Sequence, residues 1–322
     1  MKEHSAVIGC GRWGTFLAWY LSGLGEDVAL YGRSASPHFT ELRNTGKNSF
    51  VTLPETVHLT SDLAEAMRAD TLFISIGSQN LRGFLREAKP LGIEEKTLVL
   101  CMKGLEQGTG MRLSEVVRDV LGEKVRLAVW VGPGHIQDFV RGVPNCMVLD
   151  SRDADLKHTL AHRLSGELIR FYEGTDLASN ELGAAAKNVY GIGAGILDAL
   201  GYGSLKGAFL VRSCVEVARL FAALGAEPKN VYGLCFLGEC ETTFFSSHSH
   251  NKRFGEKFIR GEAEDTLCEG IYTLEVLHRL AEEKDLDLPI CRALYDFVIA
   301  KKTSDPETLL ASLFARSLKK EF

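Results

Sequence analysis

The sequence predicts an α/β domain built on a doubly wound parallel sheet, followed by an all-α domain. In the first half, short β-branched runs alternate with helix-period segments, which is typical of parallel strands covered by helices on both faces. From about residue 180 onward the strand-like runs disappear and long helical segments follow one another. A length of 322 residues also exceeds the roughly 250–300 residues that one core usually supports. We therefore expect two domains, 1–178 and 179–322.

The elements follow from hydrophobic periodicity and from Gly or Pro punctuation. The predicted strands are 5–8, 27–31, 71–76, 97–101, 127–131, 146–149 and 169–172. The helices between them are predicted at 13–24, 81–89, 113–121 and 154–168. In the second half we expect helices at 181–200, 206–224, 230–237, 270–284 and 290–300.

Composition narrows the functional class. A formal charge of −5 gives no electrostatic reason to expect a nucleic-acid partner, which favours a basic surface. The eight cysteines are scattered without a CxxC pair and predict reduced thiols in a cytoplasmic protein. The most apolar helical stretch, 184–200, contains Lys187, Asn188 and Asp198, and is too short and too polar to span a membrane.

The N-terminal strand leads into the glycine-rich sequence GCGRWG at 9–14. In this GxGxxG pattern, Gly9 allows a tight turn, Gly11 lets the backbone approach a pyrophosphate, and Gly14 allows close packing of helix on strand. The following helix offers unpaired N–H groups and a positive dipole end to phosphates. The context of strand, loop and helix predicts a Rossmann-type dinucleotide site; a glycine-rich turn without a ligand is the alternative.

The end of the second predicted strand bears on which dinucleotide is bound. An acidic residue in this position usually binds the ribose of NAD, but this chain has Gly32-Arg33-Ser34. An arginine beside a hydroxyl suits the 2′-phosphate of NADP, so NADP is favoured and NAD is not excluded. Alternatively, Arg33 is a solvated surface charge.

Two lysines occupy positions of chemical interest. Lys103 follows the predicted strand 97–101, near the carboxyl edge of the sheet where ligands bind in such folds. Lys187 lies in an apolar helical stretch, and a lysine buried there must be paired or lose its proton. Such a residue is a candidate acid–base group, with Asn188 beside it to orient a substrate. A lysine that extends to solvent is the alternative.

Taken in order, these motifs resemble the NAD(P)-dependent glycerol-3-phosphate dehydrogenase family along nearly the whole chain. The matching sequences are GCGRWGT at 9–15, IGSQ at 76–79, KGLEQGTG at 103–110, VGPGH at 131–135, NELGAAAKNVYGIGAGILDALGYG at 180–203, NKRFGEKFIRG at 251–261, CEG at 268–270 and LPI at 288–290. The resemblance implies a C-terminal domain like that of 6-phosphogluconate dehydrogenase. It also implies reduction of dihydroxyacetone phosphate to sn-glycerol 3-phosphate with NADH or NADPH, for glycerophospholipid synthesis.

The resemblance also implies roles for individual residues. Lys187 would act as general acid and base, and Lys103 would polarise the substrate carbonyl, with Glu239 as the third catalytic group. The implied cofactor residues are Gly9, Gly11, Arg12, Trp13, Gly14, Arg33, Lys103, Leu267 and Glu269. The implied substrate residues are Lys103, Gly132, Gly134, Lys187, Asn188, Ser249, His250 and Asn251.

The chain departs from the family pattern at the substrate site. Glu239 stands where the family has aspartate, and His250 stands where the family has an arginine that grips the substrate phosphate. Histidine cannot form the bidentate fork of arginine. Gly134 replaces a serine or threonine. These changes leave open a reductase for another small anionic carbonyl compound, or a cofactor-binding protein with little catalysis.

A metal site is not expected. His248 and His250 lie close together in the sequence, but no further Cys/His pair at zinc spacing follows them, and a polar loop is the simpler interpretation. His135 is expected near the cleft, with loop packing as an equal alternative. Apolar faces in the helical half are compatible with a homodimer.

Overall fold

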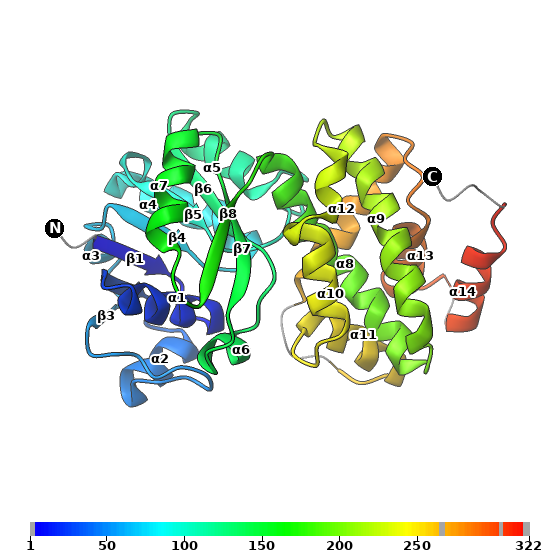
Figure 1. Cartoon of the computed structure of the whole chain (residues 1–322), viewed down its shortest axis with the longest axis horizontal. Coiled ribbons are helices and arrows are strands. Elements are labelled where there is room, and N and C mark those ends of the chain that lie inside the picture. Colours follow the sequence, from blue (N-terminus) through cyan, green and yellow to red (C-terminus); the bar gives the residue numbers. More distant parts are fainter. Residues whose placement is uncertain (1–3, 264–267, 303–304, 318–322) are drawn as a thin grey trace.

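The computed structural model of the protein describes residues 4–263, 268–302 and 305–317. Figure 1 shows two bodies side by side, one a sheet flanked by helices and the other made of helices. The strands are β1 His4–Ile8, β2 Asp27–Tyr31, β3 Val57–Thr60, β4 Thr71–Ile74, β5 Thr97–Leu100, β6 Arg126–Val131, β7 Asn145–Asp150 and β8 Ile169–Glu173. The predicted fold class is confirmed.

Helices of the first body are α1 Arg12–Gly23, α2 Pro37–Thr45, α3 Leu63–Ala66, α4 Leu81–Ala88, α5 Leu113–Leu121, α6 Ile136–Val140 and α7 Ala154–Leu164. Those of the second are α8 Leu177–Ala199, α9 Lys206–Ala223, α10 Glu239–Phe244, α11 His250–Arg260, α12 Glu269–Glu283, α13 Pro289–Val298 and α14 Pro306–Phe314. The predicted boundary at 178/179 falls in the first turn of α8 and stays a prediction.

The strands form one sheet in the order β3-β2-β1-β4-β5-β6-β7-β8. Residues of β4 and β5 are buried throughout because helices cover both faces. Side chains of α1 and α7 pack on the face that includes Val7, whereas α4 and α5 pack on the face that includes Ile8. The chain reverses its direction of winding between β1 and β4, so the loop after β1 lies at the switch point where α/β sheets bind ligands.

Two details of the sheet differ from the sequence prediction. Strand β3 was not predicted because it is an edge strand with one exposed residue, and its four residues form no continuous apolar run. Strand β7 runs antiparallel to β6, so the sheet is not parallel throughout. The connection between them contains only the five-residue α6, which is too short to return the chain to the opposite edge.

The helical body is organised around α8, which is buried on nearly all sides. Its glycines let α11 approach very closely. A Cβ at Gly195 would lie 1.9 Å from the Lys252 carbonyl oxygen, and one at Gly255 would lie 2.1 Å from that of Ile192. The close approach therefore requires glycine at both positions, and it brings the start of α11 beside the middle of α8.

The segment predicted as a helix at 230–237 is not an α-helix. A 3-10 turn at Pro228–Tyr232 is followed by a π-helical turn at Leu234–Gly238. Gly233 adopts an extended conformation between the two turns and interrupts the regular hydrogen-bond pattern. This irregular segment leads directly into α10.

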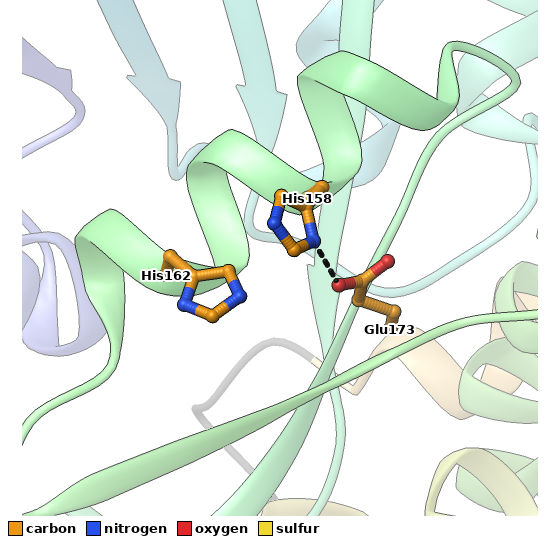
Figure 2. A group of neighbouring side chains, drawn as sticks. All are labelled: His158, His162 and Glu173. Carbon is orange, nitrogen blue, oxygen red and sulfur yellow. Dashed lines mark hydrogen bonds and ion pairs between the residues drawn. The ribbon is translucent and has the colours of Figure 1, made fainter.

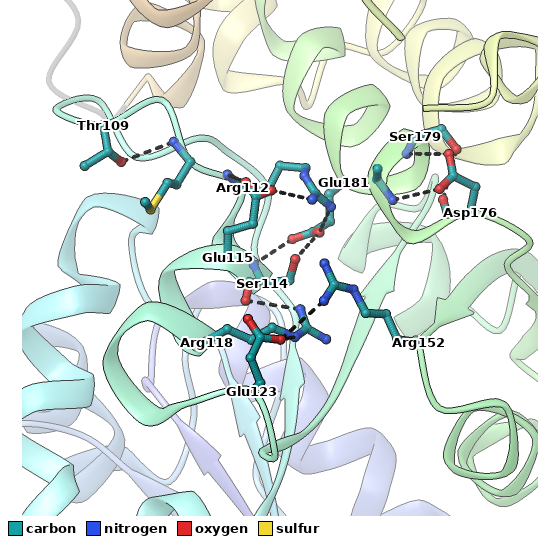
Figure 3. Close-up of polar contacts among 12 residues, drawn as sticks. Thr109, Arg112, Ser114, Glu115, Arg118, Glu123, Arg152, Asp176, Ser179 and Glu181 are labelled. Carbon is teal, nitrogen blue, oxygen red and sulfur yellow. Dashed lines mark hydrogen bonds and ion pairs between the residues drawn. The ribbon is translucent and has the colours of Figure 1, made fainter. Parts of the chain in front are cut away.

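A buried carboxylate joins the two bodies (Figure 3). Glu181 of α8 accepts hydrogen bonds from the Ser114 backbone N–H at 2.9 Å and from the Ser114 hydroxyl at 2.5 Å. Arg112 adds a contact of 3.2 Å. Burial opposes ionisation of Glu181 and raises its pKa, although Arg112 acts in the opposite direction. The start of α5 is thereby fixed to α8.

No helix among the described residues has both the length and the apolar character needed to cross a membrane.

Candidate functional site

The glycine-rich loop after β1 has the shape expected of a dinucleotide site. Gly9 has a φ of 110°, and a Cβ there would lie 2.3 Å from the Ser75 carbonyl oxygen. A Cβ on Gly14 would lie 1.8 Å from the Gly9 carbonyl oxygen, so α1 packs directly on the loop. By contrast, a Cβ on Gly11 would meet nothing within 4 Å. Gly11 is also the N-cap residue of α1, and no side chain caps the first N–H groups of this helix.

The open space at Gly11 and the uncapped N–H groups of α1 are what a pyrophosphate requires, since helix N-termini bind anions through these groups. The residues present therefore fit NAD or NADP. Arg33 is 68% exposed, and its guanidinium pairs with Glu87 at 2.9 Å. Its predicted role at the 2′-phosphate stays a prediction.

Three charged side chains from distant parts of the chain meet beside this loop. Lys103 follows β5, Lys187 lies in the middle of α8, and Glu239 begins α10. One Glu239 carboxylate oxygen contacts the Lys103 ammonium, and the other lies 3.1 Å from the Lys187 Nζ. Glu239 is only 3% exposed, so this carboxylate is shared between two ammonium groups away from solvent.

Burial and charge act in opposite directions on this group. Burial favours the neutral acid at Glu239, but the two lysines outweigh it and hold the pKa of the carboxyl below its ordinary value. For Lys103, burial lowers the pKa, and the attraction of Glu239 only partly offsets this. The arrangement is an ionised carboxylate between two lysines, with one positive charge in excess.

The two lysines have further acceptors. Lys103 donates to the Gly132 carbonyl oxygen at 2.9 Å, and Lys187 donates to the Thr243 hydroxyl at 3.2 Å. Thr243 was missed by sequence reasoning. It lies four residues after Glu239, so it shares one face of α10 with that residue, and this spacing could have indicated it.

The lysines open onto a cavity of about 290 Å³ between the two bodies. This volume suits a small molecule rather than a polymer. Its lining residues are Arg12, Trp13, Lys103, Gly134, His135, Ile136, Gln137, Lys187, Glu239, Thr242, Thr243, His248, Ser249, His250 and Asn251. Most of the predicted substrate residues thus surround one cavity, next to the nucleotide loop. Their binding roles stay predictions.

Three of the predicted substrate residues have structural partners. Asn251 donates to the Asn188 side chain at 2.8 Å and accepts from the Gly270 N–H at 2.9 Å. Asn188 is 4% exposed and is not part of the cavity lining. Ser249 caps α11 by accepting from the Lys252 N–H at 3.3 Å. These contacts fix α11 and α12 against α8.

Glu269, another predicted cofactor residue, lies at the junction of the two bodies. Glu269, the first residue of α12, accepts from the Ser78 hydroxyl at 2.5 Å and from the Ser78 backbone N–H at 3.1 Å. Burial raises the pKa of its carboxyl. Leu267 lies outside the described residues, so its predicted role has no structural counterpart here.

His250 lines the cavity and contacts Arg12, which begins the helix after the nucleotide loop. Its Nε2 contacts an Arg12 guanidinium nitrogen, and its Nδ1 lies 2.9 Å from a guanidinium nitrogen of Arg253. Two cationic groups thus converge on the residue that stands in place of the family arginine.

A separate group of metal-ligand side chains lies on the surface (Figure 2). His158 and His162, one turn apart on α7, lie close to Glu173 at the end of β8. All three are exposed, and His158 Nδ1 is already hydrogen bonded to Glu173 at 2.8 Å. None of the three contributes to the cavity lining.

Comparison with known proteins agrees with this geometry. Family models described as the N-terminus and the C-terminus of NAD-dependent glycerol-3-phosphate dehydrogenase match residues 4–157 and 176–310. The chain is 35% identical to the glycerol-3-phosphate dehydrogenase (NAD(P)+) of Exiguobacterium sp. over 317 residues, covering 94% of this chain and 93% of that protein. It is 33% identical to glycerol-3-phosphate dehydrogenase (NAD(P)+) 2 of Salinibacter ruber, covering 100% of this chain and 97% of that protein.

Among solved structures, the glycerol-3-phosphate dehydrogenase of Coxiella burnetii superimposes with a TM-score of 0.89 at 28% identity, covering 98% of this chain and 99% of that one. Both halves are matched in sequence and in structure. The resemblance predicted from the sequence motifs is thereby confirmed: the chain belongs to the NAD(P)-dependent glycerol-3-phosphate dehydrogenase family.

Proposed function

We propose that the chain reduces dihydroxyacetone phosphate to sn-glycerol 3-phosphate, reversibly, with NADH or NADPH. The observation that carries the proposal is the pair of lysines held by Glu239 in a small cavity beside the nucleotide loop. The bound nicotinamide supplies the hydride to the carbonyl carbon. The protein supplies orientation, charge and the proton.

Each lysine keeps one donor for the substrate. An ammonium group has three N–H donors. Lys103 directs two of them to Glu239 and Gly132, and Lys187 directs two to Glu239 and Thr243. The third donor of each can hydrogen bond to a carbonyl oxygen in the cavity. Two cations at that oxygen stabilise the negative charge that develops during reduction.

The hydrogen-bond partners distinguish the two lysines. A lysine that releases a proton gains a lone pair, and the Gly132 carbonyl beside Lys103 can only accept, so it cannot donate a hydrogen bond to that lone pair. The Thr243 hydroxyl can also donate, so it can reverse its bond when Lys187 has released a proton. Lys187 is therefore suited to proton transfer, and Lys103 to polarising the carbonyl. Glu239 opposes the effect of burial on Lys103 and holds both lysines in position.

The cellular setting belongs to the same proposal. Eight cysteines without a disulfide among them support a reducing cytoplasm, and glycerol 3-phosphate would serve glycerophospholipid synthesis. A homodimer is proposed on the apolar helical half, and its mass in solution tests it. A net charge of −5 supports the expectation of no nucleic-acid partner.

The test is oxidation of NADH and of NADPH in the presence of dihydroxyacetone phosphate, followed by the absorbance of the reduced nicotinamide. Turnover that depends on the substrate, with product identified as sn-glycerol 3-phosphate, is the expected result. Cofactor binding without turnover by the folded protein would contradict the proposal.

A further inference from the structure

The cavity contains one cation that no carboxylate neutralises among the described residues. Lys103 and Lys187 share the carboxylate of Glu239. Arg12 is the third strongly basic residue of the cavity lining, and it has no acidic partner among the residues that the structure describes. The Arg12 guanidinium lies 4.6 Å from the centroid of the Phe50 ring. Its Nε atom is buried and has no hydrogen-bond partner among the described residues. A partly buried guanidinium in this state is prepared to bind an anion.

His250 cannot satisfy the two guanidinium groups around it. A neutral imidazole has one acceptor nitrogen and one N–H, yet Arg12 faces Nε2 and Arg253 faces Nδ1. One guanidinium therefore meets a ring N–H. The Arg253 contact, at 2.9 Å, has the length of an ordinary hydrogen bond. If Nδ1 accepts from Arg253, the ring proton lies on Nε2, and two donors face each other at Arg12.

We propose that Arg12 and the Nε2–H of His250 together bind the phosphate of the substrate, with Arg253 holding the ring in the required tautomer. An anion between the two donors would accept from both, and the guanidinium would give the planar fork that phosphate favours. Arg12 is also the first residue of α1, so the positive end of that helix adds to the attraction. This inference rests on the proposed function, since it assigns one end of the same substrate.

One cavity is lined both by the two lysines and by Arg12 and His250, so it offers partners for both ends of a small phosphorylated carbonyl compound. The reacting carbonyl would lie at the lysines, and the phosphate would lie at Arg12 and His250, which contact each other beside the glycine loop. An arginine supplied by the nucleotide-binding half would thus replace the guanidinium that α11 lacks at position 250. The pyrophosphate of the cofactor offers the same chemistry near this loop, so the experiment must separate the two phosphates.

The primary variant is Arg12→Ser, with Arg43→Ser on the exposed side of α2 as the matched control. Three quantities are measured: kcat/KM for dihydroxyacetone phosphate, kcat/KM for phosphate-free dihydroxyacetone at high concentration, and the Kd of NADPH. We expect the first to fall about 10- to 100-fold, because a charge-assisted contact is lost. The second and third should change less than about threefold, which is below the loss expected for such a contact.

A parallel loss with both substrates, together with weaker NADPH binding, would assign Arg12 to the cofactor and overturn the proposal. The double variant Arg12→Ser/His250→Arg gives a second test, because it moves the guanidinium to α11. Recovery of at least about tenfold in kcat/KM for dihydroxyacetone phosphate is expected if the corner binds phosphate. No recovery in a folded double variant, judged by its thermal unfolding, would count against it.

Binding of inorganic phosphate, measured by calorimetry on the unmodified chain and on Arg12→Ser, separates this inference from the proposed function. Weaker binding by the variant supports the phosphate corner even if dihydroxyacetone phosphate is not turned over. Equal binding by the two proteins overturns it, whatever the activity.

Discussion

The Nζ of Lys187 lies 3.1 Å from the Oε2 of Glu239, in a pair that joins the middle of α8 to the first residue of α10. Glu239 is buried at 3% exposure, and Lys187 is partly buried at 13%. Because Glu239 also contacts Lys103, each of its two carboxylate oxygens is paired with a lysine. This arrangement gives the cavity its excess positive charge and determines what substitutions at the site should do.

Replacement of Lys187 by alanine should lower kcat by about 10²- to 10⁴-fold, the usual contribution of a positioned acid or base. The Kd of the cofactor should change little, because the nucleotide loop lies between β1 and α1, whereas Lys187 lies on α8. Lys124→Ala, at an exposed position, is the control. Normal turnover in a folded Lys187→Ala protein would show that this lysine does not transfer the proton.

Replacement of Glu239 by glutamine should destabilise the protein by about 3–5 kcal/mol, because two partly buried ammonium groups lose a buried counter-charge. It should also lower the pKa of Lys103 further, since Glu239 is the group that opposes the effect of burial. Urea unfolding measures the first effect. Glu241→Gln, exposed on the same helix, should leave stability within about 0.5 kcal/mol; equal losses from both variants would contradict the assigned role.

Removal of the Glu181 carboxylate should weaken the attachment of α5 to α8 and so lower the free energy of unfolding. Glu181→Ala leaves the Ser114 N–H and the Arg112 guanidinium without this partner (Figure 3), at an expected cost of about 3–5 kcal/mol. Glu123→Ala removes a 76% exposed carboxylate from Arg118 and Arg152 and should cost at most about 1 kcal/mol. Chemical denaturation of both variants checks the difference, and similar costs would refute it.

Glu216 should make stability fall as pH rises towards neutrality. Burial raises its pKa to about 7, against an ordinary value near 4.5. Between these values the folded state holds a proton that the unfolded state has lost, so its contribution is complete below about pH 4.5 and is lost as pH passes about 7. The shift corresponds to about 3 kcal/mol.

The Glu216→Gln variant isolates this effect from other titrating groups. The difference in unfolding free energy between the wild type and the variant should fall by about 3 kcal/mol from pH 4.5 to pH 8. A difference that does not vary with pH would show that the buried carboxyl titrates normally.

Treatment with a strong chelator should leave turnover unchanged. The carboxylate that lines the cavity, Glu239, is already occupied by two lysines, and the surface group of His158, His162 and Glu173 does not line the cavity. Loss of activity on chelation that is restored by added Zn²⁺ would contradict this expectation.

Local patterns in the sequence predicted local structure well. The position of the glycines directly after the first strand predicted the tight loop, and the change from β-branched runs to long helical segments predicted the fold class. Strand β3 was missed because an edge strand has little apolar character to detect. The antiparallel direction of β7 was missed because it depends on the short path of the 132–144 connection.

The candidate site was predictable only in part. Lys103 and Lys187 stood out individually, one for its position after a buried strand and the other for its apolar surroundings. Thr243 could have been predicted only from its spacing of four residues from Glu239. The hydrogen bond between Asn251 and Asn188 depends on the packing of α11 on α8. Arg12 was predicted at the cofactor, whereas its contact with His250 lies across the two bodies.

By itself, the sequence determined the α/β class of the first half, the helical character of the second, the glycine loop and the presence of lysines in apolar surroundings, because periodicity and backbone sterics act over a few residues. Only the tertiary structure decided that Lys103 and Lys187 share one carboxylate and that two arginines converge on His250. Those contacts join residues far apart in the chain. They exist because close packing, such as that of Gly195 and Gly255 between α8 and α11, fixes distances that no local pattern encodes.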